Sequence, residues 1–512
     1  MTTTMAKARH VPAAALLLAL APACRAELKF TPLVDVRETY SDNINLQDRA
    51  NARAQWLTDV APGFELEDNS PNLKLRAAYR QHLFYTPNKD LPNTQNSQSQ
   101  GALDANAALV KDLFYLDASG SVSQQETSAF GAPVLDNGYT TTNRTTVRTY
   151  RVSPYLHHNF GAFASADVRY TRDSVSSNNN GLGDSKGNSV SLGLNSGLAF
   201  TRLGWGLQYY RQVLHDTRGG NSVSESASAN LRYVLGPTLN LTASGGYDSY
   251  DYPTLNNATA GRSWSGGFEW VPTSRTSVRA SIGRHYYGKS GSLLASHRSR
   301  ATVWTVSYDD SVSNTRSNFL LPAAVDTAAL LDRLLSSSIT DPVLRALAVK
   351  AYIQSTGLPP ALADSVNYLS NRYFRQRQLQ AAVAYQSSHS LATFSVFDTR
   401  RQALSLFQSD SLLLGGNSSA LNDDTHQIGA SLMWNVQLSS RTSVNASLAH
   451  TNVESTSLGF STRNSVARLM FSRQLGSKMA ATVEVHHAIG SVGVGAGDYK
   501  ENAVSVSLST KF

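Results

Sequence analysis

The feature that most constrains this chain is a strict alternation of apolar and polar residues at its end. In the closing segment VSVSLSTKF, one face of an extended strand carries Val504, Val506, Leu508, Thr510 and Phe512. The other face carries Ser505, Ser507, Ser509 and Lys511. Such a strand, closed by an aromatic residue, is typical of the last strand of an outer-membrane β-barrel, where one face meets lipid and the other a polar lumen.

The same alternation recurs along the chain, for example at 72–85, 277–287, 301–308 and 427–438. Period two indicates strands, and these segments approach the 9–11 residues that a tilted strand needs to cross a membrane. A soluble β-sandwich would not need strands of this length, and a β-solenoid would show a fixed repeat, which the sequence lacks.

Two classes of connection separate the predicted strands. The short turns lie at 110–113, 159–162, 235–238, 439–442 and 475–478, and the long polar segments include 127–141, 174–188, 250–260 and 408–423. Short periplasmic turns and long external loops are typical of bacterial outer-membrane barrels. We therefore predict an all-β fold, a transmembrane antiparallel β-barrel of about 18–22 strands with 20 as the best value.

Counting strands from the two ends gives a conflict near residue 312, because bacterial barrels usually have an even strand number. Either one strand is misassigned, or the segment after residue 312 crosses the lumen. At the same place, residues 322–371 change to a helical pattern: Asp341-Pro342 suits a helix start, Leu344, Leu347, Ala348 and Ala351 recur at helical spacing, and Gly357 suits the end. This predicted helical insertion could plug the pore or decorate one rim, and both interpretations stay open.

Composition agrees with a barrel. Hydrophobic residues make up 41% of the 512 residues, and the mean hydropathy is −0.27. Half of each strand of a membrane barrel faces water, so a low hydropathy is expected. The N-terminus reads as a secretion signal, with Lys7, Arg9 and His10 before an apolar run from Ala13 to Ala21.

We predict a signal peptide over 1–26 and a barrel over 27–512, located in the Gram-negative outer membrane. The only cysteine, Cys24, precedes the expected cleavage before Glu27. A lipoprotein signal is the alternative, but Ala21-Pro22-Ala23 lacks the usual leucine. A mature chain without cysteine excludes disulfides and thiolate metal sites.

The formal charge is +8, with the basic residues scattered rather than clustered, which argues against nucleic-acid binding. Charged residues on the polar strand faces are the candidates for lining the pore. They are Lys74, Arg76, Arg80, His82, Asp167, Arg169, Arg279, His285, Glu484 and His486. Their positive bias could favour anionic solutes, or the charges could simply pair across neighbouring strands.

No motif points to catalysis. The chain has no GxSxG elbow, phosphate-binding loop or zinc motif. The pairs His157-His158 and His486-His487 would point to opposite faces of a strand, which disfavours chelation. Asp42-Asn43 and Asn422-Asp423-Asp424 could bind Ca²⁺, although loop polarity explains them equally simply. We expect no enzyme, no cofactor and no metal.

The segment from Phe30 to Leu46 reads FTPLVDVRETYSDNINL. It resembles the start of the outer-membrane barrel family associated with PEP-CTERM/exosortase systems. The matching residues are Pro32, Val36, Glu38, Thr39, Tyr40, Ser41, Asp42, Asn43, Ile44 and Leu46. The segments 341–359 and 367–385 resemble the C-terminal half of that family.

The resemblance implies a barrel encoded beside exopolysaccharide and exosortase genes, without known catalytic positions. It favours a porin-like barrel serving exopolysaccharide export. A non-conducting barrel that anchors surface material, and a barrel enzyme acting on lipid or polysaccharide, are the alternatives. Expected partners are outer-membrane lipid and lipopolysaccharide, the barrel-assembly machinery reading Phe512, anionic polysaccharide and periplasmic export components. The C-terminus is expected at the periplasmic rim, with its strand beside strand one near Leu33.

Overall fold

The computed structural model describes residues 28–87, 96–135, 138, 143–178, 184–217, 220–251, 259–320, 370, 372–405, 424–491 and 497–512. The predicted signal peptide, Cys24 and nearly all of the predicted helical insertion at 322–371 lie outside these residues. The described part forms one sheet of 22 strands.

The first eleven strands are β1 Lys29–Ser41, β2 Gln55–Asn69, β3 Leu73–Tyr85, β4 Ser97–Val110, β5 Phe114–Glu126, β6 Arg144–Phe160, β7 Ala164–Ser177, β8 Ser185–Ser196, β9 Leu203–Asp216, β10 Gly220–Gly236 and β11 Leu239–Asp251. The others are β12 Ala260–Thr273, β13 Thr276–His285, β14 Gly288–Arg298, β15 Thr302–Asn314, β16 Tyr373–Gln386, β17 Ser390–Ala403, β18 Asp424–Ser439, β19 Thr442–Ser455, β20 Phe460–Gln474, β21 Met479–Ser491 and β22 Asp498–Lys511. A short helix, α2 Thr315–Leu320, follows β15.

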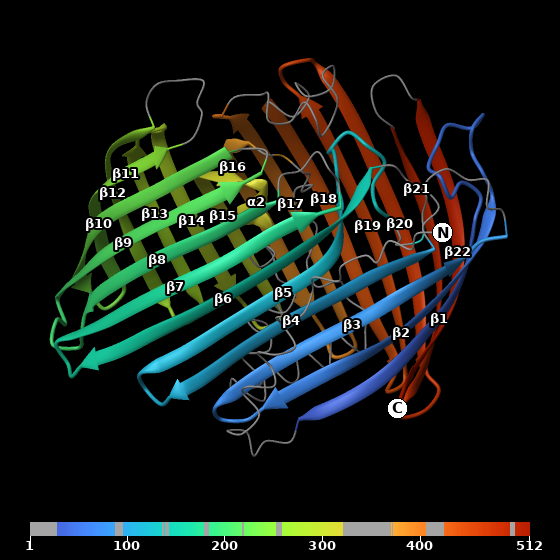
Figure 1. Cartoon of the computed structure of the whole chain (residues 1–512), viewed down its shortest axis with the longest axis horizontal. Helices are drawn as coiled ribbons and strands as arrows, with labels where there is room; N and C mark the ends of the chain where they lie inside the picture. The colour runs from blue at the N-terminus through green and yellow to red at the C-terminus, as the bar shows by residue number, and fades with distance from the viewer. Residues whose placement is uncertain are drawn as a thin grey trace, which may run out of the picture.

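Each strand pairs antiparallel with the next strand in the chain, and β22 pairs with β1, so the sheet closes into a barrel (Figure 1). The closing register runs from Leu33 opposite Lys511 to Ser41 opposite Ala503. The Phe512 amide also donates to the Pro32 carbonyl at 2.9 Å. The predicted position of the last strand beside strand one, near Leu33, is therefore confirmed.

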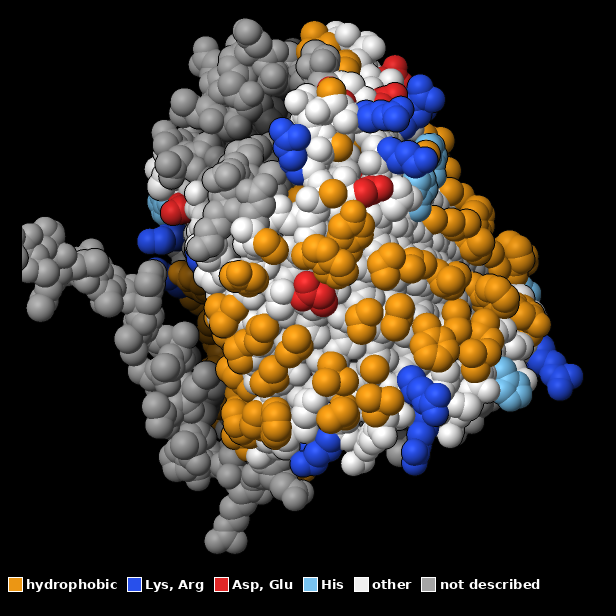
Figure 2. All heavy atoms as spheres, turned by 90° about the vertical axis from the view of Figure 1, so that its right-hand side faces the viewer, with side chains coloured by type: hydrophobic (Ala, Val, Ile, Leu, Met, Phe, Trp, Pro, Cys, Tyr) orange, Lys and Arg blue, Asp and Glu red, His pale blue; other side chains and the backbone are white. Residues whose placement is uncertain are grey.

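The two strand faces differ as the alternation predicts. Along β22, Val504, Val506 and Leu508 are exposed, whereas Glu501 and Ser505 are buried on the face toward the lumen. Other strands repeat this pattern, and exposed apolar side chains form a broad belt around the outside of the barrel. In Figure 2 this belt lies between an upper and a lower zone where Lys and Arg side chains gather.

The strand number corrects one expectation. The barrel has 22 strands, the upper limit of the predicted range, rather than 20. The number is even, so the start of β1 and the end of β22 lie at one rim. The predicted rule of long external loops fails at the connection between β13 and β14, which is the two-residue turn Tyr286–Tyr287 before Gly288, whose φ is +119°.

The rim that carries the short turns, the start of β1 and the end of β22 is called the periplasmic rim, and the opposite one the outer rim. No helix in the described ranges is long and apolar enough to cross a membrane. Every backbone group at membrane depth must be hydrogen-bonded, which a closed barrel with an apolar belt achieves. The protein is accordingly an outer-membrane β-barrel.

Candidate functional site

The lumen is the candidate functional site, because the barrel encloses a wide space. With 22 strands spaced about 4.8 Å apart and tilted by about 40°, the backbone diameter is roughly 40 Å. Barrels of this size need loops or domains to fill the lumen if they are not to be open channels.

The pairing register places all ten predicted pore-lining side chains on the lumen-facing side of their strands. They are Lys74, Arg76, Arg80 and His82 on β3, Asp167 and Arg169 on β7, Arg279 and His285 on β13, and Glu484 and His486 on β21. Whether any of them contacts a passing solute stays a prediction.

Most of these side chains lie beside an acidic or basic partner on a nearby strand, and the histidine pairs are ion pairs only when the imidazole is protonated. The pairs are Arg80 with Asp35 at 2.8 Å and Glu65 at 3.6 Å, His82 with Asp59 at 2.8 Å, His157 with Asp167 at 2.7 Å, Arg169 with Asp117 at 2.6 Å, Arg279 with Glu269 at 2.6 Å, and His285 with Asp248 at 2.7 Å. Of the two interpretations left open by the sequence, cross-strand pairing therefore describes most of the wall.

Lys74 and Arg76 differ, since neither makes an ion pair with another described residue. Both line a hollow of 730 Å³ on the inner wall between β2 and β9. Its other lining groups include Asp104, Asn106 and Ser153, so the surface mixes charges of both signs with amide and hydroxyl groups. This hollow can hydrogen-bond a hydrophilic ligand at many points.

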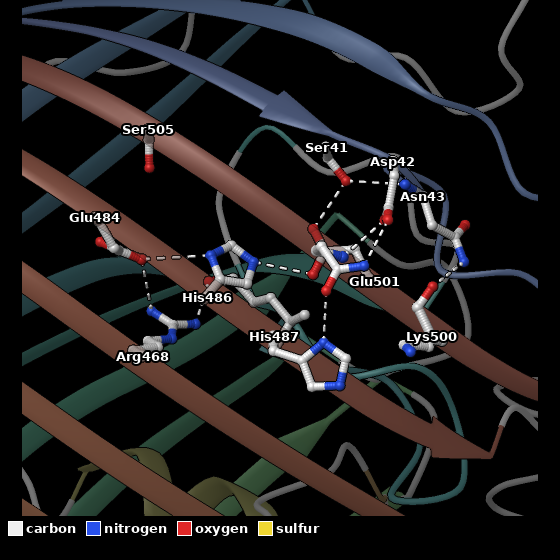
Figure 3. Close-up of polar contacts among 12 residues, drawn as sticks. Ser41, Asp42, Asn43, Arg468, Glu484, His486, His487, Lys500, Glu501 and Ser505 are labelled. Carbon is white, nitrogen blue, oxygen red and sulfur yellow. Dashed lines mark hydrogen bonds and ion pairs between the residues drawn. The ribbon is translucent and has the colours of Figure 1, made fainter.

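A buried acid–histidine cluster lies on β21 and β22, beside the seam with β1 (Figure 3). His486 is 1% exposed, and its Nε2 lies 3.0 Å from Glu501 Oε2, which is fully buried. Its Nδ1 lies 3.5 Å from Glu484 Oε1. Arg37 and Arg468 approach the same Glu484 carboxylate at 3.4 and 3.8 Å. The cluster joins β20, β21, β22 and β1 by ion pairs across their inner faces.

The segment that carries the family resemblance forms the outer end of this seam. Ser41 Oγ donates to Glu501 Oε1 at 2.8 Å. Both Asp42 oxygens accept from Asn502, one from its backbone amide and one from its Nδ2, each at 2.7 Å. These contacts, visible in Figure 3, attach the end of β1 to β22.

Asn43 fixes the loop that follows β1. Its Nδ2 donates to the Gln47 carbonyl at 2.7 Å and to the Lys500 carbonyl at 3.0 Å, and its Oδ1 accepts from the Gln47 amide. The side chains of Asp42 and Asn43 are thus engaged in hydrogen bonds, which supports the loop-polarity interpretation over a Ca²⁺ site. No group of three or more His, Cys, Asp or Glu within the described ranges could hold a metal ion.

Two outer loops fold inward at the seam. Ile44 and Leu46 of loop 42–54 are fully buried and pack with Leu57, Phe84 and Tyr499 on the inner wall. Loop 127–143 starts at β5 but reaches the far wall, because Phe130 packs on Val453 and Phe460 of β19 and β20. The Leu135 carbonyl of that loop also accepts from Arg468 at 2.9 Å. These loops occupy part of the lumen near the outer rim.

Helix α2 enters the lumen from the end of β15. Asn314 caps it, with its Oδ1 accepting from the Ser317 amide at 2.6 Å. Arg316 forms an ion pair with Asp173 of β7, which is 2% exposed, and its Nε donates to Ser185 of β8 at 2.7 Å. Burial lowers the pKa of Arg316 to about 10, so the guanidinium stays charged at neutral pH.

Of the two explanations of the parity conflict, a misassigned strand is the one that the closed sheet of 22 strands bears out. The segment 315–320 enters the lumen, and residues 321–369 lie outside the described part of the chain. Figure 1 draws α2 within the outline of the barrel. The predicted plug at 322–371 lies outside the described residues, apart from Ser370.

Sequence reasoning found Asp167 and Glu484 but missed the other acidic partners, and it missed the inward loops. Strand alternation in β2 could have predicted two of these acids, because Asp59 and Glu65 fall on the same, lumen-facing side of the strand as Leu57. The apolar residues Ile44, Leu46 and Phe130 within otherwise polar loops were a signal for inward folding.

The sequence matches no family model and no curated protein. Solved structures of similar fold include a ferric enterobactin receptor, PfeA, of Pseudomonas aeruginosa, at 13% identity over 96% of this chain and 82% of that chain, with a TM-score of 0.49. Another is the FrpB iron transporter of Neisseria meningitidis, at 10% identity over 95% and 83%, with a TM-score of 0.49. A third is the siderophore receptor PirA of Pseudomonas aeruginosa, at 12% identity over 96% and 81%, with a TM-score of 0.40. At these values the likeness assigns neither a family nor a ligand to this chain.

Proposed function

We propose that the protein is a porin-like conduit of the outer membrane that serves exopolysaccharide export in an exosortase-associated system. The observation that carries the proposal is the 730 Å³ hollow on the inner wall, lined by hydroxyl, amide and charged groups. A polysaccharide offers many hydroxyl groups, and a wall with both donors and acceptors binds these weakly at many points. Weak, repeated binding favours passage, because conduction requires that a solute can also leave.

The link to exopolysaccharide rests on the resemblance of residues 30–46 to the exosortase-associated barrels. The paired charges of the wall favour a neutral or mixed-charge polymer over the purely anionic polymer that the scattered arginines first indicated. Catalysis is not part of the proposal, and the expectation of no enzymatic activity stays a prediction.

A non-conducting structural barrel is the second candidate, and the inward loops favour it. Loops 42–54 and 127–143 and helix α2 all take up space in the lumen. If they block it entirely, the protein would stabilise the surface or anchor material there without transport.

Conductance of the purified full-length barrel in planar bilayers separates the two candidates. The conduit predicts open channels whose current neutral oligosaccharides reduce, and Arg76→Gln with Lys74→Gln should change that reduction by about twofold to tenfold. Arg172→Gln, on the outward face of β7, is the matched control and should leave the reduction unchanged. A correctly folded barrel that carries no current supports the structural candidate and contradicts the conduit.

A further inference from the structure

Two arginines and a histidine form a row on the outer surface of the barrel, and the histidine, His426, also lies directly opposite Glu454 of β19. Arg377 of β16 lies directly opposite Arg400 of β17, which in turn lies directly opposite His426 of β18. The row shares its face with Leu379 and Ile428, which are 45% and 48% exposed in the apolar belt. The three side chains therefore point away from the lumen, toward the membrane surroundings.

Like charges directly opposite each other destabilise a sheet unless something neutralises them. Asp310 and Asp398 do so only partly, since Arg377 Nε lies 3.5 Å from Asp310 Oδ2 and Arg400 Nε lies 3.6 Å from Asp398 Oδ1. Both distances exceed those of a direct N–H···O hydrogen bond. The side chains of Arg377 and Arg400 are 44% and 64% exposed.

The neighbouring Arg375, at the same rim, differs from Arg377 and Arg400 because its guanidinium makes short hydrogen bonds to a carboxylate. Its Nε and Nη2 donate to the two Asp310 oxygens at 2.8 and 2.7 Å, and its side chain is 13% exposed. Asp310 is thus occupied mainly by Arg375. Asp398 is shared in the same way, because His426 Nε2 lies 3.0 Å from its Oδ2. Arg377 and Arg400 keep most of their donors for another acceptor.

A hollow of 330 Å³ lies beside this row. It is lined by four arginines, one carboxylate and polar side chains: Arg375, Arg377, Arg400, Arg401, Asp424, Gln402, Thr425, His426 and Thr456. It sits near the outer-rim end of β16, β17 and β18, where β16 begins at Tyr373 and β18 at Asp424. Toward the membrane, Phe394 and Trp434 on the same strands are 44% and 52% exposed. An amphiphile with an anionic head and acyl chains would match the row above and the belt below.

We propose that Arg377, Arg400 and His426 bind a phosphate group of lipid A, the lipopolysaccharide anchor, in the outer leaflet. Guanidinium groups bind phosphate through short, charge-assisted hydrogen bonds in a fork geometry. Because the row faces outward at the outer rim, a lipid headgroup reaches it by lateral diffusion, whereas a solute in the lumen does not. The proposal is independent of the conduit function, since it concerns the opposite face of the wall.

The test is titration of the purified full-length barrel in detergent with lipid A that carries its phosphates and with enzymatically dephosphorylated lipid A. The wild-type protein is expected to bind the phosphorylated form about tenfold more tightly. The double variant Arg377→Gln/Arg400→Gln should lose this preference. Unheated gel mobility checks that the variant barrel is folded.

Arg172→Gln is the matched control, because Arg172 is an exposed, outward arginine whose directly opposite neighbours are Val152 and Asn188 rather than charged residues. It should keep the full preference. Equal binding of both lipid forms by the wild type, or a preference that survives in the folded double variant, overturns the proposal. Inorganic phosphate should compete weakly because it lacks acyl chains, and complete competition at the same phosphate concentration overturns the lipid assignment.

Discussion

At the scale of single residues, Asn43 makes the densest set of contacts at the seam. Its amide group makes three hydrogen bonds, to the Gln47 amide and carbonyl and to the Lys500 carbonyl, and the residue is 2% exposed. Asn43→Ala leaves these backbone groups without partners in a buried place. We expect a loss of about 2–3 kcal/mol in the free energy of unfolding, measured by denaturant titration of the barrel in detergent.

Asn51→Ala provides the control within the same loop. Asn51 is exposed, and its side chain makes one hydrogen bond, to Asp48 Oδ1 at 2.9 Å. Its replacement should cost less than about 0.5 kcal/mol. Equal effects of the two substitutions would show that burial of the Asn43 amide does not anchor the loop.

The sequence predicted which side chains face the lumen, because strand alternation alone decides the face. It did not predict that Arg80 meets Asp35, or that His486 lies between Glu484 and Glu501. Such pairs depend on the register between strands, and a shift of two residues would keep every face and change every partner. The alternation pattern therefore could not predict the balance of charge in the lumen.

At the scale of elements, Arg316 attaches α2 to the wall through a buried ion pair with Asp173 and a hydrogen bond to Ser185. Arg316→Ala removes the partner of Asp173, which is 2% exposed, and leaves a buried carboxylate uncompensated. We expect a destabilisation of about 3–5 kcal/mol, read as a lower temperature for the loss of fast migration in unheated gels. Alternatively, α2 detaches from the wall in this variant, so that water reaches the Asp173 carboxylate. Limited proteolysis after residue 314 would detect the detached helix.

The double variant Arg316→Gln/Asp173→Asn separates charge from packing. Asn keeps the shape of Asp, and Gln keeps the inner part of the arginine side chain; both charges are lost, so most of the stability should return. The arginine side chain fits at this place because residue 187 is a glycine: a Cβ there would lie 2.6 Å from Arg316 Nη2. A double variant as unstable as Arg316→Ala would mean that the loss in Arg316→Ala does not arise from the uncompensated charge of Asp173.

Element prediction failed where a connection broke the general rule. The two-residue turn at Tyr286–Tyr287 lies at the outer rim, where the general rule for outer-membrane barrels predicts a long loop. Gly288 takes the positive φ that so tight a turn requires. The polar segment 127–141 was predicted to be an external loop. Phe130, at 2% exposure, shows that a few apolar residues suffice to draw a polar loop inward.

At the scale of the whole molecule, the outer and inner surfaces carry separate tasks. The outer surface has an apolar belt for lipid and a row of two arginines and a histidine at the outer rim, whereas the inner surface carries paired charges and polar groups. Both surfaces come from alternate residues of the same strands, so closure between β1 and β22 is what keeps them apart. An open barrel would expose the seam acids Glu484 and Glu501, which are 6% and 0% exposed.

Closure can be tested with a cysteine pair across the seam. Val36 of β1 lies directly opposite Leu508 of β22, and both side chains are exposed on the outer face. Directly opposite residues of antiparallel strands have Cα atoms about 4.5–5.5 Å apart, within reach of a disulfide. Under oxidising conditions, Val36→Cys/Leu508→Cys should therefore form a crosslink that makes the heat-denatured chain migrate faster until it is reduced.

Val36→Cys/Val504→Cys is the control. Val504 lies on the same face but opposite Tyr40, and so roughly 13 Å along the strand from Leu508. Efficient crosslinking of the control, or none in the folded test variant, would contradict both the register and the 22-strand closure.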